Sequence, residues 1–310
     1  MTRLMTLDGT PMSRQCFGCM QFGGTADRAA SHAMFDAACA AGINIFDTAH
    51  LYTEGRSETW LGEVIGPRRD ALLIATKVGY TGGSGRANIL SSFDESRARL
   101  GLDMVDILYL HRWDGTTPLE ETFETLAGLQ SSGRIRHIGV SNFAAWQVMK
   151  AQAVAQALGM RIDLIQPMYS LVKRQAEVEL LPMAAAEGIA VLPYSPLGGG
   201  LLTGKYARGD VGRLSTDPRY AARYGPAWMH EAAAGLAALG DELDMDPATL
   251  AVAWVMTHEA ISAPIVSARS EAQLRPSLAA LTYPLSDTLH AQISALSPRP
   301  APATDRLEEA

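Results

Sequence analysis

The sequence has few cysteines and no long apolar run, and each absence argues against a class of protein. Only three cysteines occur among 310 residues, which argues against a disulfide scaffold and fits a reducing compartment. No uninterrupted apolar run reaches about 18 residues, the length that a transmembrane helix needs. The first residues also lack the apolar core of a signal peptide. We therefore expect a cytoplasmic protein with no membrane partner.

An excess of basic residues is absent as well. The chain has 26 Lys and Arg against 33 Asp and Glu, so its net charge is −7. Nucleic-acid partners need a broad positive surface, so none is expected. Cys16 and Cys19 form a C-x-x-C pair, but no second pair follows it downstream. Because a structural zinc site needs four ligands, we read these residues as partly buried thiols and expect no metal.

No segment rich in proline, glycine or serine divides the chain, and 47% of the residues are hydrophobic, enough for a large core. Short apolar runs recur instead, each followed by a segment with helical spacing. Strands that are buried on both faces of a parallel sheet have this composition. The runs lie at residues 15–18, 43–46, 72–76, 105–110, 137–140, 162–165, 189–193 and 263–266.

The segments between the runs carry helix signals. Thr117, Pro118 and Glu120 match a capping box with proline at the first helical position. Apolar residues then follow at three- and four-residue spacing until Gly133, a residue type that commonly ends helices. We expect a helix between these limits.

Eight strand–helix units favour an α/β fold of the (β/α)8 TIM-barrel type, with an open doubly wound sheet as the alternative. Asp8 and Gly9 predict the turn of an N-terminal β-hairpin that covers the bottom of the barrel. Residues 198–227 predict a long loop after strand 7. We expect residues 1–310 to form one barrel domain, with 297–310 as a flexible tail.

Polar residues close most of the predicted strands. In a (β/α)8 barrel the reactive groups lie where strands end and loops begin. Such groups are costly to bury unless they face one shared cavity, so we predict a polar cup at one mouth of the barrel. The strand-end residues are Asp47, Lys77, His111, Ser141, Asn142, Gln166, Tyr194, Ser267 and Arg269.

Four residues could form a tuned proton donor in this cup. Asp47, Lys77 and His111 close neighbouring strands, and Tyr52 lies on the loop five residues after Asp47. A lysine ammonium beside a phenol lowers the phenol pKa from its usual value of about 10. A carboxylate would hold that lysine, and a neutral histidine would orient a substrate oxygen. This set suits hydride addition to a carbonyl, with a cofactor as the hydride source.

The residues around Tyr52 resemble the signature of the aldo-keto reductases. The stretch Asp47-Thr48-Ala49-His50-Leu51-Tyr52-Thr53-Glu54-Gly55-Arg56-Ser57-Glu58 is similar to D-T-A-x-x-Y-x-x-G-x-S-E. Further matches occur at 75–78, 110–111, 139–143 and 194–205, so the resemblance runs from about residue 3 to 282. It implies that Tyr52 donates the proton, that Lys77 and Asp47 tune it, and that His111 orients a small-molecule carbonyl substrate.

The resemblance also implies a nicotinamide cofactor that lies across the mouth. Ser141, Asn142 and Gln166 would hold the carboxamide, and Tyr194 would stack on the nicotinamide ring. The remaining cofactor contacts that the resemblance implies are Ser195, Leu197 and Lys205 at the pyrophosphate, Arg269, Ser267 and Gln273 at the adenosine, and Gly18 and Met20. A guanidinium suits a 2′-phosphate, so NADP(H) is favoured over NAD(H).

The sequence departs from the family pattern after the last strand. Ser267 stands where the family usually has glycine. Pro276 and Ser277 stand where it has a Glu-Asn pair, of which the asparagine reads the adenine. These departures weaken the expected adenine contacts and the preference for NADP, but they do not involve the catalytic four.

Other chemistries fit the residues less well. The stretch Gly199-Gly200-Leu201-Leu202-Thr203-Gly204-Lys205 is close to a phosphate-binding P-loop, but Tyr206 replaces the required Ser or Thr. No G-x-G-x-x-G follows a predicted strand, which argues against a Rossmann site. A metal among His50, Asp47 and His111 would be repelled by Lys77. Two functions stay open beside the reductase: a Schiff-base lyase that uses Lys77, and a cofactor-sensing regulatory subunit with little turnover.

Overall fold

The computed structural model describes residues 4–309 and contains one sheet of eight parallel strands in the order β7-β6-β5-β4-β3-β2-β1-β8. Each strand overlaps one of the eight predicted runs. The strands are β1 (Cys16–Gly18), β2 (Ile45–Asp47), β3 (Leu73–Val78), β4 (Val105–Leu110), β5 (Ile135–Ser141), β6 (Leu164–Gln166), β7 (Ala190–Val191) and β8 (Ile265–Val266).

The two ends of the sheet meet through hydrogen bonds between the chain after β7 and the chain at β8. The Ile265 amide donates to the Pro193 carbonyl at 2.8 Å, and the Ser262 amide donates to the Val191 carbonyl at 2.9 Å. Tyr194 and Ile265 also form a parallel bridge. The sheet therefore closes on itself. This confirms the predicted (β/α)8 barrel, and the open-sheet alternative is wrong.

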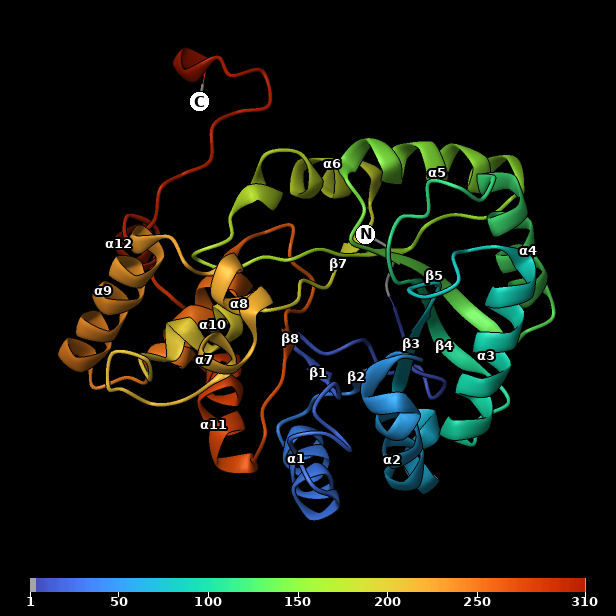
Figure 1. Ribbon diagram of the computed structural model, residues 1–310, viewed down its shortest axis with the longest axis horizontal. Helices are drawn as coiled ribbons and strands as arrows, with labels where there is room; N and C mark the ends of the chain where they lie inside the picture. Colours follow the sequence, from blue (N-terminus) through green and yellow to red (C-terminus); the bar gives the residue numbers. More distant parts are fainter. Residues whose placement is uncertain (1–3, 310) are drawn as a thin grey trace.

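Helices surround the strands (Figure 1). A helix follows each of the first six strands, and the chain after β7 carries several. The helices are α1 (Arg28–Ala40), α2 (Arg56–Ile65), α3 (Arg86–Leu100), α4 (Leu119–Ser131), α5 (Ala145–Ala157), α6 (Leu180–Glu187), α7 (Arg213–Thr216), α8 (Pro218–Arg223), α9 (Ala227–Leu243), α10 (Pro247–Thr257), α11 (Glu271–Ala279) and α12 (Asp287–Ser294).

The helix predicted from the capping box begins as expected but without the predicted cap. α4 starts at Leu119 and ends at Ser131, shortly before Gly133, which has a φ of 71°. The Thr117 hydroxyl does not cap this helix, because it donates to Asp114 Oδ2 at 2.6 Å. Hydrogen bonds to an ionised carboxylate are stronger than those to neutral partners, so Asp114 takes the hydroxyl that the sequence pattern assigned to the helix.

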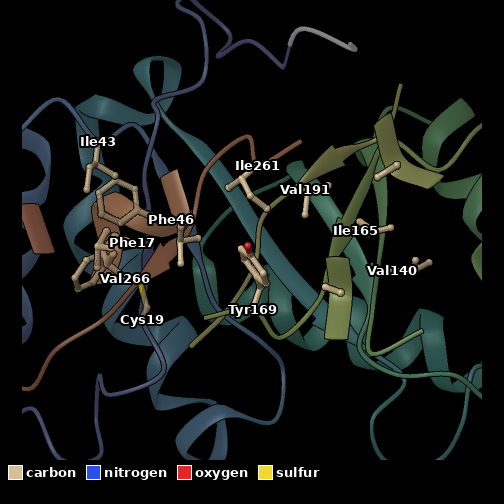
Figure 2. Close-up of a cluster of buried hydrophobic side chains, with 14 of the residues drawn as sticks. Phe17, Cys19, Ile43, Phe46, Val140, Ile165, Tyr169, Val191, Ile261 and Val266 are labelled. Atoms are coloured by element: carbon tan, nitrogen blue, oxygen red, sulfur yellow. The ribbon is translucent and has the colours of Figure 1, made fainter. Parts of the chain in front are cut away.

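The core has two parts, which follow from the two-residue alternation of each strand. Along each strand, one side chain points into the barrel and the next points to the helices. Ile45 and Ile107 therefore lie in the inner cluster, while Phe46 and Leu108 lie in the larger outer one. Figure 2 shows the outer cluster, in which Phe46 packs among other buried side chains. Strands of a barrel must be apolar on both faces for this reason.

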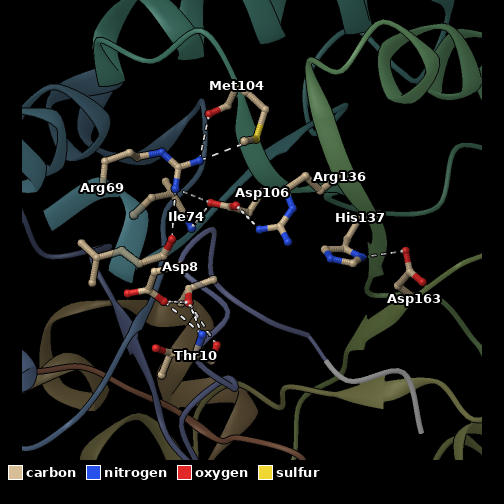
Figure 3. Close-up of polar contacts among 11 residues, drawn as sticks. Asp8, Thr10, Arg69, Ile74, Met104, Asp106, Arg136, His137 and Asp163 are labelled. Carbon is tan, nitrogen blue, oxygen red and sulfur yellow. Dashed lines mark hydrogen bonds and ion pairs between the residues drawn. The ribbon is translucent and has the colours of Figure 1, made fainter.

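A short hairpin and an ionic cluster lie at the end of the barrel where the strands begin (Figure 3). Met5 and Pro11 form an antiparallel bridge, and the Asp8 amide donates to the Asp70 carbonyl just before β3. The N-terminal hairpin is therefore present at the bottom of the barrel. Asp106, near the start of β4, binds Arg69 and Arg136 at 2.8 and 2.9 Å.

The segment 198–227 is the long connection that the sequence predicts after β7. It contains a 3-10 turn at Gly198–Thr203, followed by α7 and α8. After α12 the chain runs away from the helices toward the C-terminus (Figure 1). Its flexibility over 297–310 stays a prediction. Within residues 4–309, none of the helices combines the length and apolar character needed to cross a membrane.

Candidate active site

A buried ion pair lies at the mouth where the strands end. Asp47 closes β2, and Lys77 lies one residue before the end of β3; their exposures are 4% and 1%. Lys77 Nζ donates to Asp47 Oδ1 and to the Thr48 carbonyl, the latter at 2.7 Å. Gln166 Nε2, at the end of β6, donates to Asp47 Oδ2 at 2.9 Å. The carboxylate therefore holds side chains from two other strands at once.

Lys77 is held in its charged form by these neighbours. Burial lowers the pKa of the ammonium group, but the carboxylate of Asp47 and the nearby Tyr52 outweigh burial and raise the pKa above its usual value. An ammonium with a raised pKa has no free lone pair at neutral pH. It acts as a fixed positive charge and not as a nucleophile.

Tyr52 lies on a tight turn directly beside this charge. It begins a 3-10 segment, Tyr52–Gly55, in which Thr53 and Glu54 have positive φ values of 49° and 58°. The Lys77 Nζ atom is 5.0 Å from the centre of the Tyr52 ring. Two successive left-handed residues are rare outside glycine, so this turn has an unusual backbone shape next to the predicted proton donor.

The pKa of Tyr52 is not lowered, contrary to the prediction from the neighbouring lysine. Burial raises the pKa of the phenol, the charge of Lys77 lowers it, and the net pKa lies above the usual value. The desolvation of a phenolate therefore outweighs the lysine at this partly buried site. The hydroxyl stays protonated at neutral pH, which is the state that can donate a proton, and Lys77 still reduces the cost of the phenolate.

His111 completes the group of four. It follows β4, its amide donates to the Val78 carbonyl at 2.8 Å, and its ring lies edge-on to that of Tyr52 with centroids 5.7 Å apart. Burial, with the charges of Lys77 and Arg112, lowers the pKa of the imidazole to about 3. The ring is therefore neutral at pH 7. Its Nδ1 atom is buried and has no hydrogen-bond partner among residues 4–309.

A second set of polar side chains spans the ends of β5, β6 and the chain after β7. Ser141 Oγ donates to the Gln166 carbonyl at 3.0 Å, and Asn142 Nδ2 donates to the His111 carbonyl at 2.9 Å. The Tyr194 hydroxyl donates to Asn142 Oδ1 at 2.7 Å. The structure thus joins four predicted cofactor residues by hydrogen bonds to Asp47 and His111, two of the four predicted catalytic residues.

Three cations gather beside the long loop. Burial lowers the pKa of Lys205, and the charges of Arg269 and Arg213 lower it further, whereas the nearby Asp210 raises it. No ion pair joins any of them to an acidic residue in the part of the chain that the structure describes. Sequence reasoning missed Arg213; the signal was the group of arginines within residues 198–227.

The other predicted cofactor residues occupy varied positions. Gly18 ends β1 opposite Asp47 in the sheet, and Met20 is half-buried. Ser267 has a buried Oγ without a partner among residues 4–309, and Gln273 accepts a hydrogen bond from the Arg269 amide. The remaining two are Ser195, which has a φ of 61°, and Leu197, which packs against the outer core.

Two of the three positions that depart from the family pattern, Pro276 and Ser277, lie in α11. Pro276 is inside the helix, and its carbonyl accepts a hydrogen bond from Thr249. Ser277 is buried, and its carbonyl accepts a hydrogen bond from Gln15 at 2.8 Å. Both backbone groups are therefore used in packing α11 against the rest of the barrel.

His50 and the cysteines form no further centre. His50 Nε2 contacts Glu95 on α3 at 2.9 Å. Cys16 and Cys19 are fully buried free thiols, and burial raises the pKa of both. Within residues 4–309, no three His, Cys, Asp or Glu side chains are grouped so that they could hold a metal ion.

Known proteins resemble this chain over most of its length. The family model described as "Aldo/keto reductase family" matches residues 15–298. The chain is 32% identical to an uncharacterized oxidoreductase, YrpG, of Bacillus subtilis, over 96% of this chain and 95% of that protein. It is also 32% identical to a probable voltage-gated potassium channel subunit beta of Oryza sativa, over 88% of each chain. A third relative is the norsolorinic acid reductase stcV of Emericella nidulans, at 32% identity over 92% of this chain and 78% of that protein.

The fold and the strand-end site define a (β/α)8-barrel protein with its polar residues gathered at one mouth. The chain belongs to the aldo/keto reductase family. It is on that ground an oxidoreductase of carbonyl compounds.

Proposed function

We propose that the protein is an NADP(H)-dependent reductase that converts aldehydes or ketones to alcohols. The observation that carries this proposal is the group of Tyr52, Lys77, Asp47 and His111 at the ends of neighbouring strands. A protonated phenol beside a fixed ammonium and a neutral imidazole suits an oxygen that gains negative charge. We place this chemistry in one cytoplasmic barrel domain with a small-molecule substrate.

In this proposal each of the four residues has a separate task. The reduced nicotinamide, when bound, supplies the hydride. Tyr52 donates its proton to the carbonyl oxygen. Lys77, whose Nζ is 5.0 Å from the centre of the Tyr52 ring, stabilises the phenolate that remains. Asp47 keeps the ammonium charged and in place. Neutral His111 holds the same oxygen by a hydrogen bond, because its lowered pKa keeps it from competing as an acid.

The unpaired cations support a phosphate-bearing cofactor. Lys205 has Arg213, Arg269 and Asp210 as charged neighbours, and the three cations form no ion pair among the described residues. The positive charges there outnumber the single carboxylate and would attract an anion. Arg269 is exposed, and a guanidinium can bind a phosphate through two parallel hydrogen bonds. NADP(H) is therefore favoured over NAD(H). Ser141, Asn142 and Gln166 would hold the carboxamide, and Tyr194 would pack on the nicotinamide ring.

The test is turnover by Tyr52→Phe, followed as loss of reduced-nicotinamide absorbance with 4-nitrobenzaldehyde. Removing one general acid costs about 10²- to 10⁴-fold in rate, so we expect kcat to fall at least a hundredfold. NADPH binding, measured by fluorescence titration, should stay unchanged, because the phenol is not among the proposed cofactor contacts. Wild-type protein assayed with NADPH and NADH tests the cofactor preference. Turnover close to wild type in Tyr52→Phe would refute the assignment of the proton donor.

A second candidate function is a cofactor-sensing regulatory subunit. It is favoured by the relatives of Oryza sativa and Arabidopsis thaliana that are named as probable potassium channel beta subunits, at 32% and 33% identity. This function would give tight NADPH binding, slow release and very slow turnover with a wide set of aldehydes. A pre-steady-state burst followed by a slow phase would favour it over the reductase.

The lyase alternative has less support. A Schiff base requires a neutral amine, whereas Lys77 is buried, paired with Asp47 and has a raised pKa. Borohydride in the presence of a carbonyl substrate should therefore leave Lys77 unmodified.

A further inference from the structure

One rim of the mouth carries exposed aromatic rings outside the catalytic four. Tyr80 is 42% exposed and lies edge-on to the His111 ring, with centroids 5.1 Å apart. Trp113 follows β4 and lies edge-on against Phe143 and Trp146, with centroids 5.3 and 5.6 Å apart. Trp146 is 62% exposed. Trp113 is half-buried and packs against the outer core, whereas Tyr80 and Trp146 stay open to water. The rim therefore joins a ring that the core holds in place to exposed rings that a ligand can reach.

A free guanidinium lies on this aromatic rim. Arg112 stands between His111 and Trp113 in the chain, and its guanidinium carbon is 4.7 Å from the centre of the Tyr80 ring. The side chain is exposed, and it forms no ion pair within residues 4–309. Stacking on an aromatic ring keeps a guanidinium in position while its N–H groups stay available. Such a group pairs with a carboxylate through two parallel hydrogen bonds.

The two loops that carry this rim are tied together. Asp114 Oδ2 accepts hydrogen bonds from the Ser84 amide at 2.8 Å and from the Thr117 hydroxyl at 2.6 Å. Asp114 Oδ1 accepts from the Thr116 amide at 2.9 Å. The loop after β3, with Tyr80, is thereby fixed to the loop after β4, with Arg112 and Trp113. A rim that is fixed before a ligand arrives loses little entropy on binding.

We propose that the preferred substrates are planar aromatic aldehydes or ketones that carry an anionic group. The ring of the substrate would pack against Tyr80 and Trp113, its carboxylate would pair with Arg112, and its carbonyl would face Tyr52 and His111. The contact of Tyr80 with both His111 and Arg112 places the anion site next to the proton donor site. This inference rests on the proposed reductase function, which it narrows to one class of substrate.

The test compares 4-carboxybenzaldehyde with its methyl ester, which has nearly the same shape and no charge. Hydrogen bonds to charged groups contribute about 1.5–3 kcal/mol, or about tenfold or more in binding. Wild-type protein should therefore prefer the acid over the ester by about tenfold in kcat/KM. Arg112→Gln should raise KM for the acid about tenfold, leave kcat nearly unchanged and leave the ester unaffected. Arg86→Gln, an exposed arginine at the start of α3, serves as the matched control.

A second variant tests the aromatic wall. Trp113→Leu should raise KM for 4-nitrobenzaldehyde several-fold more than KM for cyclohexanecarboxaldehyde, because only the flat ring gains from stacking. Equal losses for the acid and the ester in Arg112→Gln, or no preference for the acid in the wild type, would overturn the proposal.

Binding without turnover separates this inference from the reductase proposal. Terephthalate carries the carboxylate and the ring but no reducible carbonyl, and its binding can be followed by quenching of tryptophan fluorescence. Arg112→Gln should weaken terephthalate binding about tenfold, whereas Arg86→Gln should not. If this difference is seen but no aldehyde is reduced, the anion subsite stands and the reductase function falls. If the two variants bind terephthalate equally, the subsite itself is refuted.

Discussion

Both ends of the barrel bury a carboxylate against cations, but they differ in what remains unpaired. At the bottom, Asp106 is fully buried and accepts hydrogen bonds from Arg69, Arg136 and the Ile74 amide (Figure 3). At the mouth, the Asp47 carboxylate accepts hydrogen bonds from Lys77 and Gln166, but two groups near this pair lack a partner. His111 Nδ1 has no partner among residues 4–309, and Arg112 has no acidic partner there.

This difference separates a structural network from a functional one. A buried charge whose bonds are all made contributes a rigid arrangement that is costly to break. Polar groups that stay without partners inside a folded protein cost free energy, and a ligand that pairs with them offsets that cost. The bottom of the barrel therefore serves the fold, and the mouth carries the function. The following predictions test this contrast.

The largest expected effect comes from Asp106→Asn. This change keeps the side-chain shape but leaves Arg69 and Arg136 facing each other without a counter-charge. Breaking one partner of a buried ionic group costs about 3–5 kcal/mol, so the free energy of unfolding should fall by that amount. Urea denaturation measures it, and kcat/KM of the folded fraction should stay unchanged.

Asp94→Asn is the control for this change. Asp94 also binds two arginines, Arg97 and Arg134, but its side chain is 54% exposed. Exposed ion pairs contribute about 0–1 kcal/mol, so the unfolding free energy should change little. Similar losses in both variants would contradict the view that burial makes the bottom cluster structural.

A smaller effect is expected from the pH dependence of His111. Its pKa is about 3 in the folded protein, against 6.5 as the ordinary value. Below pH 6.5 the unfolded chain binds a proton there and the folded protein does not, so stability falls as the pH falls toward 3. At pH 4.5 this costs about 2–3 kcal/mol. Lowering the pH from 7.5 to 4.5 should therefore reduce the free energy of unfolding of the wild type by about 2–3 kcal/mol more than that of His111→Gln.

Urea unfolding at both pH values measures the difference in unfolding free energy between His111→Gln and the wild type. If this difference between His111→Gln and the wild type stays constant from pH 7.5 to 4.5, the site does not hold the imidazole neutral.

The sequence predicts the bottom and the mouth of the barrel to different degrees. The eight strands and the strand-end residues Asp47, Lys77 and His111 follow from runs of apolar residues that end in a polar one. This pattern is local, so it can be recognised without the structure. The position of Arg112 on the Tyr80 ring depends on how two loops fold together, which no periodicity encodes.

The remaining differences between the predictions and the structure arise where interactions compete or where the sequence pattern is weak. Thr117 matches a capping pattern, but Asp114, three residues earlier in the chain, takes its hydroxyl. The pKa of Tyr52 depends on a balance between burial and the Lys77 charge, and burial cannot be read from the neighbours in sequence. Arg213 was missed because its helix, α7, is only four residues long and lies in a segment without strong periodicity.

The smallest expected effect concerns the unpaired cations at the mouth. Arg269 is exposed, so Arg269→Gln should leave the unfolding free energy unchanged within about 0.5 kcal/mol. If it pairs with the 2′-phosphate of the proposed cofactor, the Kd for NADPH should rise about tenfold while that for NADH changes little. Arg275→Gln on α11, the helix that begins two residues after Arg269, is the control, because Arg275 is already paired with Glu271 at 2.9 Å. Equal weakening of both cofactors by Arg269→Gln would place this arginine elsewhere than at the 2′-phosphate. No weakening of either would show that its lack of an acidic partner has no bearing on cofactor binding.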